Sequence, residues 1–345
     1  MNEPVPEFVK RIRTPKAPGD PTKHHYIPQF LLRNFSKSNQ LSAKQIGEDK
    51  IKCIAVGKAA SISNFYTVID AEIGETVVIE RLLAEIEGEA APIIQSLIRE
   101  VGFPLSLSNR STISTWVGLQ AVRDPQTRVM YQTLFELHFK MELNAVRDKQ
   151  SAREYLKKRG LKPTDENVNQ ILDVVNSIDE LTITPHQNQL VQMMLHSALD
   201  LAERFMELGF SIVKFEQNGL LLPDHCVTRS QTKYVLDNGL PESEFFIPLD
   251  RKTLLLIHHP RWREDIHRES KLTQDRVNSI LSSNALEWAF THPDDSTLLT
   301  RHEFSGRTAP LMSVDFVGGQ PTHTPGVNRP LGNRRIVRFS KPDGD

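Results

Sequence analysis

The longest amphipathic pattern in the chain lies between residues 76 and 101, and it limits the possible folds more than any other feature. Its apolar side chains recur at helical spacing: Val77, Ile79, Leu82, Leu83, Ile86, Ala90, Ile93, Ile94, Leu97 and Val101. An apolar stripe that spans so many positions needs other elements to cover it. The pattern predicts a long, central, buried helix that packs against the helix containing Trp116.

Shorter patterns place the remaining elements. Helical spacing covers residues 26–36, 109–123, 125–147, 186–208 and 273–290, and a pair of helices within 151–180. Strand-like runs cover 41–46 and 50–56, then Phe210–Phe215, Gly219–Leu222, Phe245–Leu249 and Thr253–Ile257. Strands at both ends of a helical middle favour an α+β protein over alternating βαβ units. We predict a mostly helical α+β fold with a small mixed or antiparallel sheet built from N-terminal and C-terminal strands.

Proline content sets the expected domain limits. Residues 1–22 contain five prolines, and residues 296–345 contain five prolines and six glycines. Segments of this composition bury too little apolar surface to offset the entropy of ordering them. We therefore expect a flexible arm over 1–22, a single α+β domain over 23–295 with its helical middle at about 109–208, and a flexible tail over 296–345.

Charge and composition exclude some classes of protein. The chain has 345 residues, of which 39% are hydrophobic and 25% are charged, as in globular proteins. Its 42 basic and 43 acidic side chains give a net charge of -1. A histone-like polycation that binds nucleic acid through bulk charge is excluded, whereas a local basic patch is not.

The cysteine content and the hydropathy indicate in which cellular compartment the protein is expected. Cys53 and Cys226 are far apart and fit neither a disulfide framework nor a thiolate zinc site. No apolar run opens the chain, and the richest one, Thr253–Ile257, is five residues long, against the roughly 18 needed to span a bilayer. We expect a cytoplasmic protein without a membrane partner. The sequence leaves the cofactor, the metal and the oligomeric state open.

The densest motif is KHHYIPQFLLRNF at residues 23–35. Further motifs follow it along the chain: Asn-Phe-Tyr at 64–66, IEGEAAP at 86–92, QAVRDP at 120–125 with Arg128, and a strand turn at Asp224. This collinear set resembles the bacterial family called domain of unknown function 4238, over roughly residues 23–295. The chain departs from the family pattern at residues 222–226 and at Glu287. The family carries no established activity, so the resemblance implies kinship but no reaction.

Three residues are candidates for catalysis. His24 and His25 precede a helix, and imidazole can act as an acid, a base or a metal ligand near neutral pH. Neighbouring side chains in an extended segment point to opposite faces, so we expect one histidine to face a site and the other to be structural. Asp224 lies between two apparent strands and is a candidate orienting group or metal ligand.

Three arginines are candidates for substrate binding. The guanidinium groups of Arg33, Arg123 and Arg128 suit two-point binding of phosphate or carboxylate. Arg123 and Arg128 flank a predicted helix start, whose positive end favours anions. The alternative is an interior network in which these arginines pair with Glu87 or Glu89.

Two functional hypotheses follow. In the first, the chain is a phosphate-directed hydrolase or nuclease-like enzyme that uses His24 or His25, Asp224 and the arginines on a nucleotide, a nucleic acid or another anionic ligand. In the second, it is a non-catalytic module that binds an anionic ligand or a partner protein. The familiar protease, NTPase, hydrolase and dehydrogenase motifs are missing.

Overall fold

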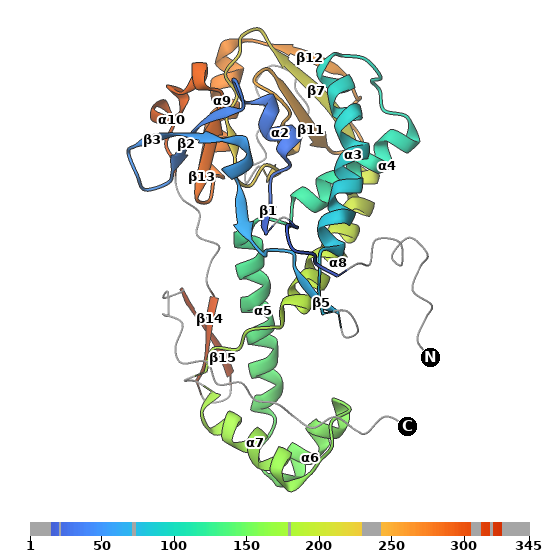
Figure 1. The fold of residues 1–345 in the computed structure, drawn as a ribbon, viewed down its shortest axis with the longest axis vertical. Helices are drawn as coiled ribbons and strands as arrows, with labels where there is room; N and C mark the ends of the chain where they lie inside the picture. The colour runs from blue at the N-terminus through green and yellow to red at the C-terminus, as the bar shows by residue number, and fades with distance from the viewer. Residues whose placement is uncertain are drawn as a thin grey trace. The chain divides into compact units, whose positions relative to one another are not determined.

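The computed structural model describes residues 15–20, 22–70, 74–178, 181–229, 243–304, 312–317 and 320–325 (Figure 1). The chain divides into two compact units. The first unit combines residues 1–128 with 187–308, and the second combines 129–186 with 309–345.

Three helices dominate the first unit. They are α3 (Val78–Ile98), α4 (Leu107–Gln120) and α8 (Gln187–Met206). α3 contacts α4, as the long apolar stripe predicts, and it buries Leu83, Ile94 and Leu97. α4 and α8 approach each other closely at Gly118, where an added Cβ would lie 2.4 Å from the carbonyl oxygen of Ala198. Any side chain larger than hydrogen at position 118 would push these two helices apart.

A four-stranded antiparallel sheet joins the two ends of the first unit. Its order is β3 (Ile51–Ala55), β2 (Gln40–Gln45), β13 (Trp288–Thr291) and β8 (Leu222–Pro223). The predicted sheet of N-terminal and C-terminal strands is therefore confirmed.

The second sheet of this unit comes from the C-terminal half alone. Its order is β12 (Ile266–Glu269), β7 (Gly209–Phe215), β11 (Thr253–His258), β10 (Ser243–Pro248) and β9 (Thr228–Arg229). β12 runs parallel to β7, and the other neighbours are antiparallel. All six residues of β11 are buried, which explains its nearly uniform apolar sequence.

The expectation of one helix over residues 273–290 is wrong. Helix α9 spans Lys271–Ser283, and residues 288–291 form the strand β13. The backbone N–H groups of Leu286, Glu287 and Trp288 donate to the carboxylate of Asp224 instead of to helical carbonyls. This side chain, 62 to 64 residues away in sequence, replaces the helical hydrogen bonds and turns the chain into the sheet.

Short elements surround the N-terminal motif. They are β1 (Lys23–His25), α2 (Gln29–Asn34), the 3-10 turn η1 (Val56–Lys58), β4 (Ser61–Ser63), β5 (Val68–Asp70) and β6 (Gly74–Thr76). β1 pairs with β4, and β5 pairs with β6. Pro28 occupies the position before α2, where its missing N–H costs no helical hydrogen bond.

The second unit has a small helical core of its own. Its helices are α5 (Pro125–Asn144), which begins in the first unit, α6 (Lys149–Lys158) and α7 (Asp165–Asn176). The side chain of Asp148 caps α6, and Thr164 caps α7 as its sequence predicts. Seven side chains from these helices and their connections form the core: Leu143, Val146, Ala152, Leu156, Val168, Ile171 and Val174. β14 (Met312–Val317) pairs with β15 (Gln320–Pro325).

The predicted arm and tail fall largely outside the described residues. Where they are described, Lys16 donates its backbone N–H to Glu75, and a short helix α10 (Leu298–Arg301) buries Leu299 completely. Structured chain thus continues past residue 295. The other domain limits, and whether the arm and tail are flexible, stay predictions.

The chain is an α+β protein, as predicted. α3 has 21 residues, but α5 and α8 have 20 each, so among the described helices none dominates by length. Within the part of the chain that the structure describes, no helix combines the length and the apolarity needed to cross a bilayer.

Candidate active-site cleft

Strand β1 directs the two neighbouring histidines to different surroundings. The His24 side chain is fully buried, its Nδ1 accepts the Tyr66 backbone N–H at 2.8 Å, and its ring stacks on that of Tyr66 with 5.7 Å between centroids. His25 instead lines a cleft. The alternation expected from an extended segment thus separates a structural histidine from one that reaches a cavity.

The cleft has a volume of about 490 Å³ and lies between α2 and the first half of α3. Its lining combines an imidazole, four charged groups of α2 and α3, an amide and several apolar side chains. The lining residues are Asp20, His25, Gln29, Phe30, Arg33, Val77, Glu80, Arg81, Leu83, Ala84 and Glu87. The size and this mixture of polar and apolar groups suit a small molecule or part of a larger one.

One wall of the cleft is a row of polar side chains. His25, Gln29 and Arg33 follow each other at intervals of four residues. Gln29 Nε2 lies 3.5 Å from His25 Nδ1, and Gln29 Oε1 accepts a hydrogen bond of 2.9 Å from Arg33 Nη2. Gln29 therefore connects the imidazole with a guanidinium group that is exposed to solvent.

The opposite wall carries two glutamates two helical turns apart on α3. Burial raises the pKa of Glu80 to about 7, the nearby Glu87 adds to this rise, and Arg123 opposes it. Burial lowers the pKa of His25 below its usual 6.5, against the opposing effect of the Val56 backbone. Near neutral pH the cleft therefore contains a neutral imidazole and a carboxyl group that is partly protonated.

Arg123 joins the walls of the cleft from within the protein. Its side chain is only 2% exposed, and each of its nitrogens donates. Nε donates to the Tyr26 carbonyl at 2.8 Å, Nη2 to the His25 carbonyl at 2.9 Å and Nη1 to Glu87 Oε1 at 2.7 Å. Of the two roles considered for Arg123, the structure shows the interior pairing with Glu87.

Arg128 and Asp224 are not among the residues that line this cleft. Arg128 donates to the Phe65 carbonyl at 2.7 Å and to Gln187, and it stacks on the Phe65 ring. The buried carboxylate of Asp224 accepts backbone N–H groups from His225 and from residues 286–288. Both residues hold segments of backbone together, and the structure brings only His25 and Arg33 of the six candidates to the surface of the cleft.

Outside the cleft, the buried carboxylate of Asp124 orients the side chain of His225. His225 Nδ1 lies 3.1 Å from Asp124 Oδ2, and the Asp124 carboxylate accepts the backbone N–H groups of Gln126 and Thr127 at the start of α5. Burial acts to raise the pKa of Asp124, but hydrogen bonds from His225 and Thr127 lower it below its usual value. This pair fixes the junction between α4 and α5.

Two further lining residues, Glu80 and Gln29, were not among the candidates predicted from the sequence. Gln29 was visible within the N-terminal motif, four residues from both His25 and Arg33. Glu80 and Glu87 are seven residues apart in the long amphipathic pattern, a spacing that places two side chains on one helix face. Among the described residues, no three His, Cys, Asp or Glu side chains are arranged to hold a metal ion.

The raised pKa of Glu80 predicts a pH-dependent stability. Because its pKa is about 7 in the folded protein and 4.5 in the unfolded chain, the folded state holds more protons between these values. The free energy of unfolding therefore falls as the pH rises from about 4.5 through 7. Full burial would make this loss about 3 kcal/mol, and partial exposure reduces it to about 1–2 kcal/mol.

Glu80→Gln removes the titrating carboxyl group. At pH 8 we therefore expect the free energy of unfolding of the variant to exceed that of the parent by about 1–2 kcal/mol, and the difference should vanish near pH 4.5. Urea unfolding at several pH values measures it. Glu89→Gln, at an exposed position of the same helix, is the control. A constant difference between the Glu80 variant and the parent at all pH values would contradict the prediction.

Comparison with known proteins identifies the family but no function. No curated protein matches the chain, and no solved structure matches it. The family model DUF4238, described as a protein of unknown function, matches residues 23–295. This range contains the N-terminal motif, both walls of the cleft and Arg123. The chain therefore belongs to the DUF4238 family.

Proposed function

We propose that the cleft is the active site of a hydrolase that acts on phosphate-bearing substrates. The observation that carries the proposal is the meeting of His25, Glu80 and Arg33 in one cavity. Catalytic sites are places where neighbouring groups have their pKa values shifted in different directions, so that one is a base and another an acid at the same pH.

Each of the three residues has a role in this proposal. Neutral His25 accepts a proton from a water molecule, whose oxygen attacks phosphorus. Protonated Glu80 donates its proton to the leaving oxygen as the phosphorus–oxygen bond breaks. Arg33, at the exposed end of the polar wall, binds the phosphate oxygens and offsets their charge. Glu87 is held by Arg123 at 2.7 Å and fixes the α3 wall of the cleft.

The proposal predicts a narrow pH optimum. His25 must be neutral, so kcat/KM rises with pH through the lowered pKa of this histidine. Glu80 must be protonated, so kcat/KM falls as the pH rises through about 7. A bell-shaped profile with its alkaline limb near neutrality is the expected result, whereas a rate that keeps rising above pH 8 would contradict the role of Glu80.

Single substitutions test the assignment directly. The substrates are p-nitrophenyl phosphate, bis(p-nitrophenyl) phosphate, nucleoside triphosphates and single-stranded DNA. We expect His25→Gln and Glu80→Gln each to lower kcat at least about a hundredfold. The melting temperature of His25→Gln should stay close to that of the parent and that of Glu80→Gln should not fall below it, since both side chains line a cavity. Glu89→Gln should retain the parent's rate. Equal rates for all of these variants would reject the cleft as the active site.

The alternative is a non-catalytic module that binds an anionic ligand in the same cleft. The exposed position of Arg33 at the end of the polar wall favours it as much as it favours a hydrolase. In that case the parent turns over none of the substrates, and calorimetry detects binding of a nucleotide or phosphate that Arg33→Gln abolishes. Turnover by the parent, lost in His25→Gln, decides for the hydrolase.

A further inference from the structure

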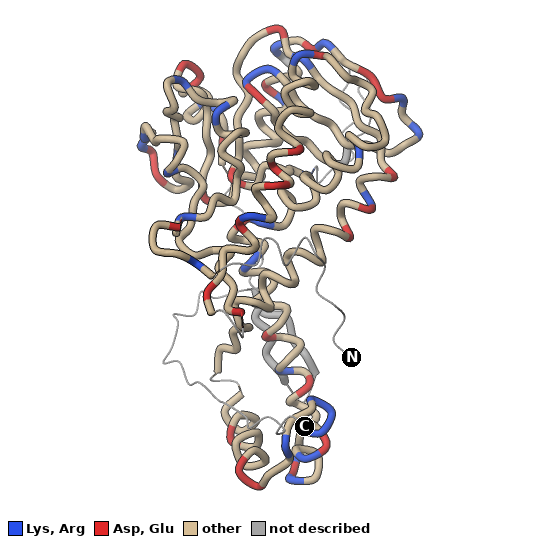
Figure 2. The backbone as a smooth tube through the Cα atoms, turned by 45° about the vertical axis from the view of Figure 1, so that its right-hand side comes forward, with Lys and Arg blue, Asp and Glu red and all other residues tan. Residues whose placement is uncertain are grey.

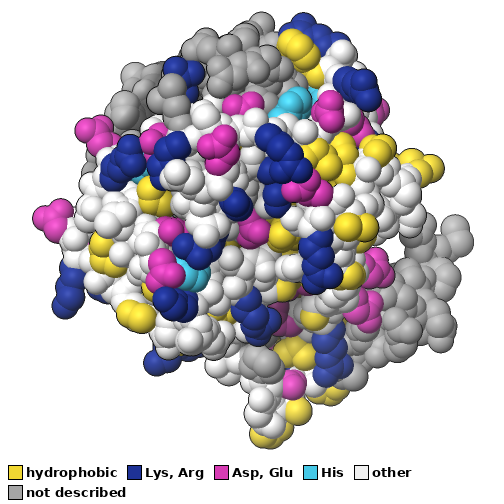
Figure 3. Space-filling view, turned by 90° about the horizontal axis from the view of Figure 1, so that it is seen from above, with side chains coloured by type: hydrophobic (Ala, Val, Ile, Leu, Met, Phe, Trp, Pro, Cys, Tyr) yellow, Lys and Arg dark blue, Asp and Glu magenta, His cyan; other side chains and the backbone are white. Residues whose placement is uncertain are grey.

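The segment that contains α6 is rich in positive charge. Residues 147–162 contain seven basic and two acidic side chains, although the whole chain has a net charge of -1. In Figure 2 blue positions gather in the α6–α7 part of the second unit. By contrast, the face of the molecule shown in Figure 3 carries basic and acidic side chains interspersed.

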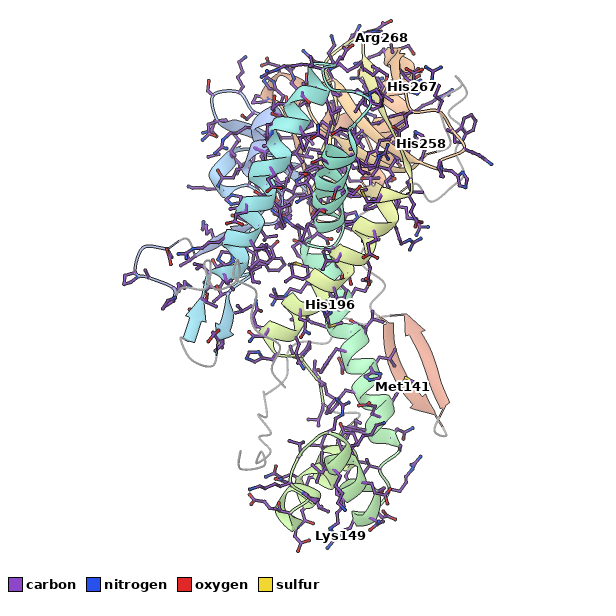
Figure 4. All side chains as sticks on the ribbon, turned by 90° about the vertical axis from the view of Figure 1, so that its right-hand side faces the viewer. Met141, Lys149, His196, His258, His267 and Arg268 are labelled. Carbon is purple, nitrogen blue, oxygen red and sulfur yellow. The ribbon has the colours of Figure 1, made fainter. Side chains whose placement is uncertain are left out.

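The small core of the second unit fixes which side of α6 faces solvent. Ala152 and Leu156 are completely buried in that core. Lys149, Arg153 and Lys157 follow at intervals of four residues along another side, so they form one row about 12 Å long. We call these three residues the α6 stripe. Lys149 and Lys157 are exposed, and Figure 4 labels Lys149 at the start of α6.

The α6 stripe is only partly neutralised by its neighbours. Arg153 pairs with Asp165, whose own side chain is 83% exposed. Within the described part of the chain, Lys149 and Lys157 take part in none of the ion pairs, whereas Arg159 beyond the helix pairs with Glu142. The ammonium groups at both ends of the row thus remain without a fixed counter-charge, which is the condition under which a surface attracts a polyanion.

The surroundings of the stripe favour one class of polyanion. A helix that inserts into a membrane surface needs an exposed apolar face, but α6 directs Leu156 inward and keeps Tyr155 half-buried beneath Arg159. A stable protein interface needs apolar or aromatic anchors, and the exposed residues of α6 are charged or polar. The phosphate backbone of a nucleic acid needs neither, because lysine and arginine bind it through charge alone.

We propose that the α6 stripe binds the phosphate backbone of nucleic acid. Lys149 and Lys157 contact phosphates through their ammonium groups, and Arg153, held in the same row by Asp165, contributes its remaining N–H donors. Such contacts carry no base specificity, and they release condensed counterions, so that affinity falls steeply with salt. The stripe belongs to a different unit from the cleft, and its binding is independent of any reaction there.

The test compares two matched double variants of the full chain. Lys149→Gln/Lys157→Gln removes both free charges of the stripe. Lys50→Gln/Lys58→Gln removes two exposed lysines of the first unit and leaves the same net charge. The probe is fluorescein-labelled DNA of about 20 nucleotides and mixed sequence, single-stranded or duplex, and fluorescence anisotropy is measured from 20 to 200 mM salt. Calorimetric melting checks that both variants remain folded.

The expected result is salt-dependent binding by the parent and by the Lys50/Lys58 variant. The stripe variant should bind roughly tenfold more weakly, and the slope of log Kd against log salt should fall by about two for duplex DNA. Equal binding by both variants overturns the proposal, and so does the absence of binding by the parent at 20 mM salt. Equally tight binding to polyglutamate or to phosphatidylserine vesicles also overturns it. None of these results depends on turnover in the cleft.

Discussion

Arg123→Met is expected to lower the free energy of unfolding by about 3–5 kcal/mol. The guanidinium group makes three hydrogen bonds from a position that is 2% exposed. Methionine fills a similar volume but leaves the carbonyls of His25 and Tyr26 without their donor and Glu87 without its counter-charge. Removal of one partner costs more than the pair contributes, because the remaining polar groups stay buried without compensation.

Urea unfolding at pH 7 measures this effect. Arg99→Met, at an exposed position at the end of α3, is the matched control and should change the free energy of unfolding by less than about 0.5 kcal/mol. Arg123→Lys keeps the charge but cannot reach three acceptors, so its stability should lie between the parent and the methionine variant. If the Arg123 and Arg99 variants unfold at the same urea concentration, the interior role of Arg123 is wrong.

Leu83→Ala is expected to cost about 2–5 kcal/mol. Leu83 is 2% exposed on α3, in the first-unit core that also buries Trp116. Truncation loses the transfer free energy of the removed methyl groups and leaves a cavity that two packed helices cannot easily close. The urea midpoint should fall while the m value stays unchanged.

Leu107→Ala provides the comparison for this second variant. Leu107 is 76% exposed at the start of α4, so its truncation should leave the midpoint almost unchanged. An unchanged midpoint for Leu83→Ala would mean that the apolar stripe of α3 is not part of the core.

Elements with strong local patterns were predictable from the sequence. The apolar period over 76–101 located α3, and alternation at 41–46 and 50–56 located the β2–β3 hairpin. The strand at 288–291 was not predictable in this way. Its pattern also fits a helix, and the choice depends on the distant carboxylate of Asp224, which binds the N–H groups that a helix would use.

The residues of the candidate site were also predictable from the sequence only in part. The types of residue in the N-terminal motif marked His25 and Arg33, and strand alternation indicated that only one of the two histidines would face a cavity. Glu80 could not be identified in advance, because its raised pKa comes from burial in the folded protein and from the nearby Glu87, against the opposing effect of Arg123. Arg123 kept two possible roles until its three acceptors were known, since the same guanidinium group suits a substrate phosphate and an interior carboxylate.

The position of Arg123 in the chain also determines when the cleft can form during synthesis. The hydrogen bonds that hold the carbonyls of Tyr26 and His25 span 97 and 98 residues. At about 5–20 residues per second, a ribosome completes the motif at least about 4 s before it adds Arg123. During that interval the strand with the two histidines lacks the donor that fixes its backbone. A nascent chain that ends before residue 123 therefore contains every side chain that lines the cleft but lacks the guanidinium group that joins its two walls.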